Sequence, residues 1–152
     1  MITIIGVGAL KDKNISALVQ EYLKRLSSER IVVLSVKEEK ATNDVDTVKK
    51  KEGERLLERI ASMKDDPFVI ALSEEGKNFT SVGFAEFLKK NAEKKIIFVI
   101  GGAYGLSDTV KKKAHLLLSL SSMTFPHEIA QLLLVEQIYR GWMINTGRKY
   151  QK

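Results

Sequence analysis

The sequence of 152 residues contains no cysteine and only two histidines. The lack of cysteine excludes disulfide bonds and thiolate metal sites, and the histidines lack the spacing of metal ligands. Uncharged stretches fall short of the roughly 20 apolar residues that a membrane-spanning helix needs. The first apolar run lacks a preceding basic segment and a small-residue cleavage site, so it predicts a strand and not a signal peptide. We therefore expect a cytoplasmic protein with no membrane span and no metal.

The common nucleotide and hydrolase motifs are also missing. There is no G-x-x-x-x-G-K-[ST] and no G-x-S-x-G, and the glycine-rich segment at residues 101–105 does not read G-x-G-x-x-G. Gly6 and Gly8 follow the first apolar run, but a third glycine and an acidic residue at the ribose-binding distance are absent. His115 stands where a strand is expected to begin, which favours a structural role. His127 stands in the first turn of a helix, where capping competes with catalysis.

The hydrophobic pattern alternates along the chain between periods of two and 3.6 residues, which predicts an α/β fold with a mostly parallel sheet flanked by helices. With 44% hydrophobic and 29% charged residues, residues 1–152 suit one globular domain. The expected strands are residues 2–8, 31–36, 68–73, 95–100 and 116–120. The expected helices are residues 14–27, 45–63, 81–91 and 126–145, the first capped by Asn14 and the third by a serine or threonine. Residues 37–46, 65–67 and 74–77 are expected to form loops and turns.

Three loops are expected to meet at one edge of this sheet. They follow the strand at residues 68–73, contain the glycines at 101–105, and carry the hydroxyl side chains at 120–125 before Pro126 opens a helix. Carboxyl-terminal strand ends in parallel sheets share an edge, where such folds bind ligands. Glycine also lets a flat ligand lie directly on the backbone. The sequence therefore predicts a ligand pocket in which the missing side chains take part in recognition.

A net charge of +6 and an isoelectric point near 9.4 permit a polyanionic partner. The abundant lysine and glutamate equally suit solvated ionic faces, as in heat-adapted proteins. The helix at residues 126–145 is apolar over a wide arc, which favours a place in the core first and a dimer interface second.

Taken together, several motifs closely resemble the RlmH family of ribosomal RNA methyltransferases in the SPOUT superfamily. They are Gly-Gly-x-x-Gly-Leu at residues 101–106, Leu-Ser-x-x-Thr-x-Pro-His at 120–127, Val-Glu-Gln-x-Tyr-Arg at 135–140, Val-Gly-x-Leu-Lys at 7–11 and Lys-Glu-Gly-Glu at 51–54. The resemblance covers essentially the whole chain. It implies S-adenosyl-L-methionine as cofactor, a carboxyl-terminal trefoil knot of the SPOUT type and a homodimer. It also implies N3 methylation of a pseudouridine in 23S large-subunit rRNA, in the assembled ribosome.

The resemblance also implies residue roles, which divide into a cofactor side and a substrate side. The cofactor contacts are expected at Leu72, Gly101, Leu120, Ser121, Ser122, Met123, Thr124 and Phe125. The catalytic or substrate-side positions are Glu136, Arg140 and Tyr150. As a hypothesis, the Glu136 carboxylate accepts the proton that leaves the acceptor nitrogen, or orients a neighbour that does. The spacing of Glu136 and Arg140 also predicts a salt bridge within the helix.

The tail departs from the family pattern at Gln151, where relatives usually carry a histidine. Glutamine cannot titrate near neutral pH, so a positioning role is favoured there over proton transfer. Two other classes of function remain open from the residues alone. One is a doubly wound nucleotide-binding enzyme, whose fingerprint is missing, and the other is a basic RNA-binding protein without catalytic activity. Binding of S-adenosylmethionine separates the second class from a methyltransferase.

Overall fold

Strands and helices alternate along the whole chain in the computed structural model, which describes residues 1–40, 42, 44–64 and 66–150. The strands are β1 (Ile2–Val7), β2 (Ile31–Val36), β3 (Phe68–Asn78), β4 (Ile96–Ile100) and β5 (Leu116–Ser119). The helices are α1 (Lys13–Arg25), α2 (Val45–Ala61), α3 (Ser81–Lys90), α4 (Asp108–Lys113) and α5 (His127–Asn145). Every predicted strand and helix is present. Among the described residues, no helix has the length and apolar character that a membrane span requires.

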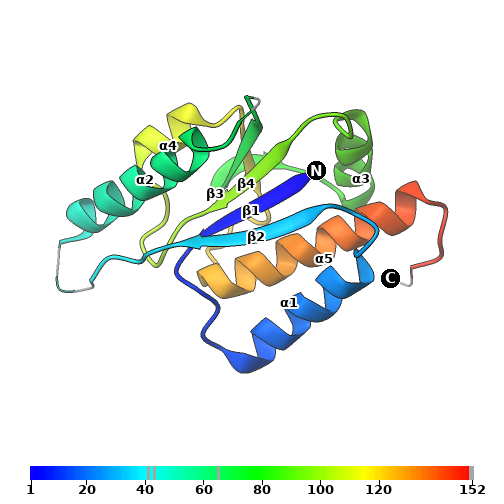
Figure 1. The fold of residues 1–152 in the computed structure, drawn as a ribbon, viewed down its shortest axis with the longest axis horizontal. Coiled ribbons are helices and arrows are strands. Elements are labelled where there is room, and N and C mark those ends of the chain that lie inside the picture. The colour runs from blue at the N-terminus through cyan, green and yellow to red at the C-terminus, as the bar shows by residue number, and fades with distance from the viewer. Residues whose placement is uncertain (41, 43, 65, 151–152) are drawn as a thin grey trace.

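The five strands form one parallel sheet in the order β2-β1-β4-β3-β5. Helices α1, α3 and α5 cover one face of this sheet, and α2 and α4 cover the other (Figure 1). Because all strands run in the same direction, their carboxyl-terminal ends lie at one edge. The loops that follow β3, β4 and β5 are therefore brought to the same side of the molecule.

The sheet is buried on both faces, which explains the unbroken apolar runs in its strands. Every residue of β4 is buried, with Phe98 at 0% exposure against the face covered by α5. The opposite face is filled from α2 and α4, where Leu56 and Val110 are buried. Helix α5 contributes Leu134 and Val135 to the first face. The prediction that α5 belongs to the core is confirmed for this side of the helix.

Two local predictions were wrong. Helix α1 is capped by Asp12 and not by Asn14, since the Asp12 side chain accepts the backbone N–H groups of Asn14 and Ile15. Strand β3 continues to Asn78 through residues 74–77, which were expected to form a loop. The pairing of β3 with β5 shifts register between Leu72 and Lys77, so these polar residues form an irregular extension of the strand.

Helix α4 was not predicted at all. Its six residues contain three consecutive lysines and one buried residue, Val110, so no hydrophobic period exists to mark it. The predicted cap of α3 is confirmed, because Thr80 Oγ1 accepts the Gly83 N–H at 3.0 Å. The predicted loop at 37–46 and turn at 65–67 lie partly outside the described residues, and Gln151 lies wholly outside them.

Candidate active site

The ends of β3, β4 and β5 enclose one pocket at the carboxyl-terminal edge of the sheet. The residues predicted to bind a cofactor line it, except Ser122, which is exposed and outside the lining: Leu72, Gly101, Leu120, Ser121, Met123, Thr124 and Phe125. The pocket contains about 580 Å³ of empty space, including the part open to solvent. The three loops therefore meet at one edge of the sheet, as the sequence predicted.

In the glycine turn, residues 101–105, glycine is required by the packing and backbone conformation of the turn itself. Gly102 and Gly105 form an isolated bridge, and the Gly105 N–H donates to the Gly102 carbonyl at 3.0 Å. A Cβ on Gly101 would lie 2.7 Å from the Gly105 carbonyl carbon, and Gly105 has a φ of 79°. Both positions need glycine to close the turn. The idea that absent side chains serve ligand recognition is therefore not required here, although Gly101, Gly102 and Gly105 all line the pocket.

The hydroxyl groups of the loop after β5 hold that loop in shape. Ser119 Oγ donates to the Ser121 carbonyl at 2.9 Å, and Ser121 Oγ accepts the Met123 N–H at 3.0 Å. Asn78 Nδ2 donates to Ser119 Oγ at 3.1 Å, so the end of β3 is hydrogen-bonded to the start of this loop. These bonds fix the backbone of residues 119–123. The Met123 side chain is left 72% exposed at the pocket.

The first turn of α5 closes the pocket and is anchored by Glu128. Glu128 Oε1 and Oε2 accept the backbone N–H groups of Lys11 and Asp12 at 3.0 and 3.1 Å. These bonds lower the pKa of Glu128 below its ordinary value, because they favour the ionised carboxylate. His127 lines the pocket, and its buried Nε2 has no hydrogen-bond partner among the described residues. The alternative, in which His127 caps the helix with its hydrogen bonds satisfied, therefore does not hold for Nε2.

The residues around the pocket fit S-adenosylmethionine, which combines a flat adenine with charged and hydroxyl groups. Leu72, Ile100 and Phe125 supply apolar wall, while Glu74 and His127 supply polar groups at the pocket. The unpartnered His127 Nε2 offers hydrogen-bonding capacity that nothing else in the described chain uses. No group of three or more potential metal ligands occurs within the described residues. The donor set thus suits an organic ligand.

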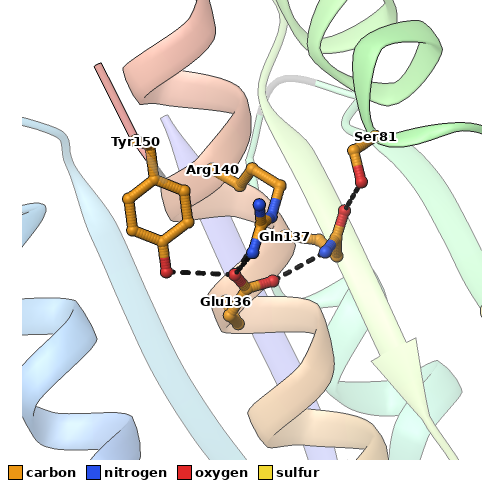
Figure 2. A network of polar contacts seen from close by, with 5 residues as sticks. All are labelled: Ser81, Glu136, Gln137, Arg140 and Tyr150. Carbon is orange, nitrogen blue, oxygen red and sulfur yellow. Dashed lines mark hydrogen bonds and ion pairs between the residues drawn. The ribbon is translucent and has the colours of Figure 1, made fainter. Parts of the chain in front are cut away.

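The predicted substrate-side residues meet in a polar network on α5 (Figure 2). Glu136 Oε1 accepts from Arg140 Nε at 3.1 Å, from Arg140 Nη2 at 2.6 Å and from the Tyr150 hydroxyl at 3.1 Å. Glu136 Oε2 accepts from Gln137 Nε2 at 2.6 Å, and Gln137 Oε1 accepts from Ser81 Oγ at 2.8 Å. The predicted salt bridge between Glu136 and Arg140 is confirmed. Tyr150 folds back from the tail to join it.

Aromatic contacts hold Tyr150 in this position. Its ring meets Tyr139 edge to face at 5.0 Å, and the Arg140 guanidinium lies 4.5 Å from its ring centre. Burial raises the pKa of Tyr150 well above its ordinary value, with contributions from Tyr22 and Glu136. The neighbouring carboxylate also raises the pKa of Arg140. Tyr150 is therefore a hydrogen-bond donor at neutral pH, and Arg140 is a fixed cation.

This arrangement bears on the hypothesis that Glu136 accepts a proton. Both carboxylate oxygens already accept hydrogen bonds, and Oε1 accepts three of them from a cation and a phenol. These bonds engage the carboxylate with Arg140, Tyr150 and Gln137. The geometry favours the other half of the hypothesis, in which Glu136 orients its neighbours. Arg140 donates from Nε and Nη2 to Glu136, and its Nη1 has no hydrogen-bond partner among the described residues.

The pocket and the network lie at different places along α5. Glu136 follows His127 by nine residues, which corresponds to roughly 14 Å along the helix axis. Sequence reasoning missed two residues of the network, Gln137 and Ser81. Ser81 begins α3 and Gln137 lies on α5, and their spacing in the sequence does not indicate that the two side chains meet. It also gave His127 no ligand role. A histidine directly after Pro126 at a predicted pocket edge was the available signal.

Comparisons with known proteins agree with this geometry. The family model described as predicted SPOUT methyltransferase matches residues 1–151. The chain is 46% identical over 160 residues to the ribosomal RNA large subunit methyltransferase H of Bacillus cytotoxicus, covering 99% of each chain. It is 47% identical over 164 residues to the protein of the same name from Shouchella clausii, again with 99% coverage of both.

Two solved structures share the fold. A probable methylase family protein of Haemophilus influenzae matches with a TM-score of 0.59 at 17% identity, covering 99% of this chain and 70% of that one. The SpoU methyltransferase AviRb of Streptomyces viridochromogenes, solved in complex with the cofactor AdoMet, matches with a TM-score of 0.50 at 11% identity. That match covers 97% of this chain and 58% of the other. At these identities the two structures are evidence for a shared fold only.

Proposed function

Because the chain belongs to the SPOUT methyltransferase family, whose fold implies a carboxyl-terminal knot, we propose that it methylates large-subunit ribosomal RNA with S-adenosylmethionine. SPOUT methyltransferases use this cofactor, and full-length relatives at 46 and 47% identity carry the name ribosomal RNA large subunit methyltransferase H. The observation that supports the proposal most is the pocket at the ends of β3, β4 and β5. It gathers the residues that the family resemblance predicted for the cofactor. The two other classes of function considered from the sequence are set aside.

On the cofactor side, Leu72, Ile100 and Phe125 would supply apolar wall for S-adenosylmethionine, and the glycine turn and the loop after β5 would hold it from the other sides. The bound cofactor supplies an electrophilic methyl group on sulfur. Transfer of such a group is an in-line displacement that depends mainly on alignment, so the principal task of the chain is to hold both partners. The buried His127 Nε2 then gains a partner on the ligand. Exclusion of water follows from the apolar wall.

On the substrate side, we assign Arg140 to hold the target nucleotide. Its guanidinium is fixed by Glu136 and stacked on Tyr150, and its Nη1 is placed to bind a base oxygen or an RNA phosphate. The target is the N3 atom of a pseudouridine in 23S rRNA, as the family resemblance implies. Glu136 and Tyr150 act as orienting groups. The N3 proton then leaves to solvent or to an oxygen of the RNA.

The roughly 14 Å between His127 and Glu136 along α5 separates the two sides within one chain. A homodimer resolves this separation if the network of one protomer faces the pocket of its partner. Half-buried apolar residues on α5, Ile129 and Leu133, support an interface on this helix. A dimer acting on large-subunit rRNA in the assembled ribosome in the cytoplasm, each chain forming one methyltransferase domain, completes the proposal.

The proposal is tested by calorimetry and methyl transfer with the purified protein. We expect S-adenosylmethionine to bind, and tritium from its labelled methyl group to enter the large-subunit rRNA of assembled ribosomes but not the small-subunit rRNA. Digestion of the labelled rRNA and mass spectrometry locate the methyl group, which is expected on N3 of a pseudouridine. Absence of cofactor binding would overturn the methyltransferase assignment. Cofactor binding with a methyl group on another base would overturn the assigned target alone.

A further inference from the structure

One motif from the sequence has no place in the pocket or in the network: Lys-Glu-Gly-Glu at residues 51–54 of α2. Two of its residues pack against the segment that contains the glycine turn. A Cβ added to Gly53 would collide with Ser107 Oγ, the residue that precedes α4. A Cβ added to Gly102 would lie 2.7 Å from Glu52 Oε2. The motif is therefore shaped to fit residues 101–107.

The Glu52 side chain joins this turn to a second loop. It is buried, with 4% exposure, and its Oε1 accepts the Glu39 backbone N–H at 3.0 Å in the loop after β2. Its Oε2 is buried beside Gly102 and has no hydrogen-bond partner within the described residues. A buried carboxyl oxygen without a partner destabilises a fold, so its presence here calls for an explanation.

Resting on the proposed function, we propose that Glu52 is a positioning residue for the cofactor: it holds the glycine turn in its binding conformation from behind. Gly102 lines the pocket on one side and meets Glu52 on the other. A displacement of the Glu52 carboxyl therefore displaces Gly102 and changes the wall of the pocket. Because Glu52 Oε1 accepts the Glu39 N–H, the same side chain also links the glycine turn to the loop after β2, which contains Lys37 and Lys40.

The surroundings of Glu52 favour its neutral form. Burial raises the pKa of Glu52, and the charges of Glu38 and Glu39 raise it further, whereas the Glu39 N–H and Arg55 on α2 lower it. These are the charged groups that act on it from the loop after β2 and from its own helix. A neutral carboxyl is also less costly than an ionised one beside Gly102, because Oε2 is buried there without a hydrogen-bond partner among the described residues.

The sign of the pH dependence follows from this. The neutral form is fully populated at low pH and is lost as the pH rises through the raised pKa. Affinity for S-adenosylmethionine is therefore expected to fall over that range in the wild-type protein. Glutamine at position 52 keeps a neutral donor and acceptor and does not titrate.

The test is calorimetry of S-adenosylmethionine binding from pH 5 to 9, on the full-length wild-type chain and three variants. We expect Glu52→Ala to weaken binding at least about tenfold, the effect of losing roughly 1.4 kcal/mol. Glu52→Gln is expected to stay within about threefold of wild type and to lose the decline with pH. Glu54→Ala, which alters an exposed glutamate of the same motif, is expected to bind like wild type.

Wild-type affinity in Glu52→Ala would overturn the positioning role, and so would equal losses in Glu52→Ala and Glu52→Gln. If Glu52→Ala does not fold, the pH profiles of wild type and Glu52→Gln decide the matter, because matching profiles contradict the proposal. Failure of the wild-type protein to bind the cofactor at any pH would instead refute the proposed function itself.

Discussion

Replacement of Glu136 by glutamine tests how the network on α5 acts. The change keeps the shape of the side chain and removes its charge. Glu136 is 16% exposed and accepts four hydrogen bonds, two of them from Arg140. Hydrogen bonds to a charged group contribute about 1.5–3 kcal/mol and neutral ones about 1 kcal/mol.

The magnitude follows from these contacts. Because the network is partly exposed and Gln137 can rotate its amide toward the new NH₂ group, we expect a loss of about 1–2 kcal/mol in the free energy of unfolding. In a chain of this size each kcal/mol lowers Tm by roughly 2–4 °C. Loosening of Arg140 is expected to slow methyl transfer about tenfold to a hundredfold, as misplaced groups do.

The assay is single-turnover methyl transfer to assembled ribosomes across pH, with calorimetry for the cofactor. The affinity for S-adenosylmethionine is expected to stay within about twofold, since the pocket lies roughly 14 Å away along α5. An orienting role predicts that the rate falls by the same factor at every pH. Glu86→Gln, on an exposed glutamate of α3, is the matched control. A full methylation rate in Glu136→Gln would refute the orienting role, and loss of one limb of the pH profile would restore Glu136 as the proton acceptor.

Three further outcomes are expected. Deletion of residues 148–152 removes Tyr150 from Glu136 and abolishes methylation while calorimetry shows unchanged cofactor affinity; full activity of the shortened chain would remove the tail from the site. His127→Ala weakens cofactor binding about fivefold to tenfold, the value of one net hydrogen bond, and an unchanged Kd would exclude contact with the ligand. Glu128 has a lowered pKa, so its stabilisation exists above the unfolded pKa near 4.5 and is lost as pH falls through the lower folded value. The Tm difference between wild type and Glu128→Gln should therefore vanish in acid, and a constant difference would contradict this origin.

The pocket was predictable from the sequence because parallel strands place their carboxyl-terminal ends together. Buried strands such as β4 also read as unbroken apolar runs. The salt bridge between Glu136 and Arg140 was predictable because residues four apart share a helix face. Each of these inferences depends on spacing within one element or on a general rule of sheet geometry.

The remaining features depend on contacts between segments far apart in sequence. The polar residues 74–77 look like a loop, and they extend β3 because β5 pairs with Lys77 and Asn78 after a shift in register. Placement of Glu52 behind Gly102 results from the packing of α2 on the turn after β4. The return of Tyr150 to Glu136 was expected from the family resemblance alone, since tails are usually solvated. Periodicity carries no information on such pairings.

The central claim is that this chain methylates large-subunit rRNA, and mass spectrometry of that rRNA from cells tests it most directly. The comparison is between cells that contain the protein, cells that lack it, and the latter supplied with the wild-type chain. The account predicts that N3-methylpseudouridine is lost when the protein is absent and returns when the chain is restored. An identical set of modified nucleotides in all three samples would contradict it.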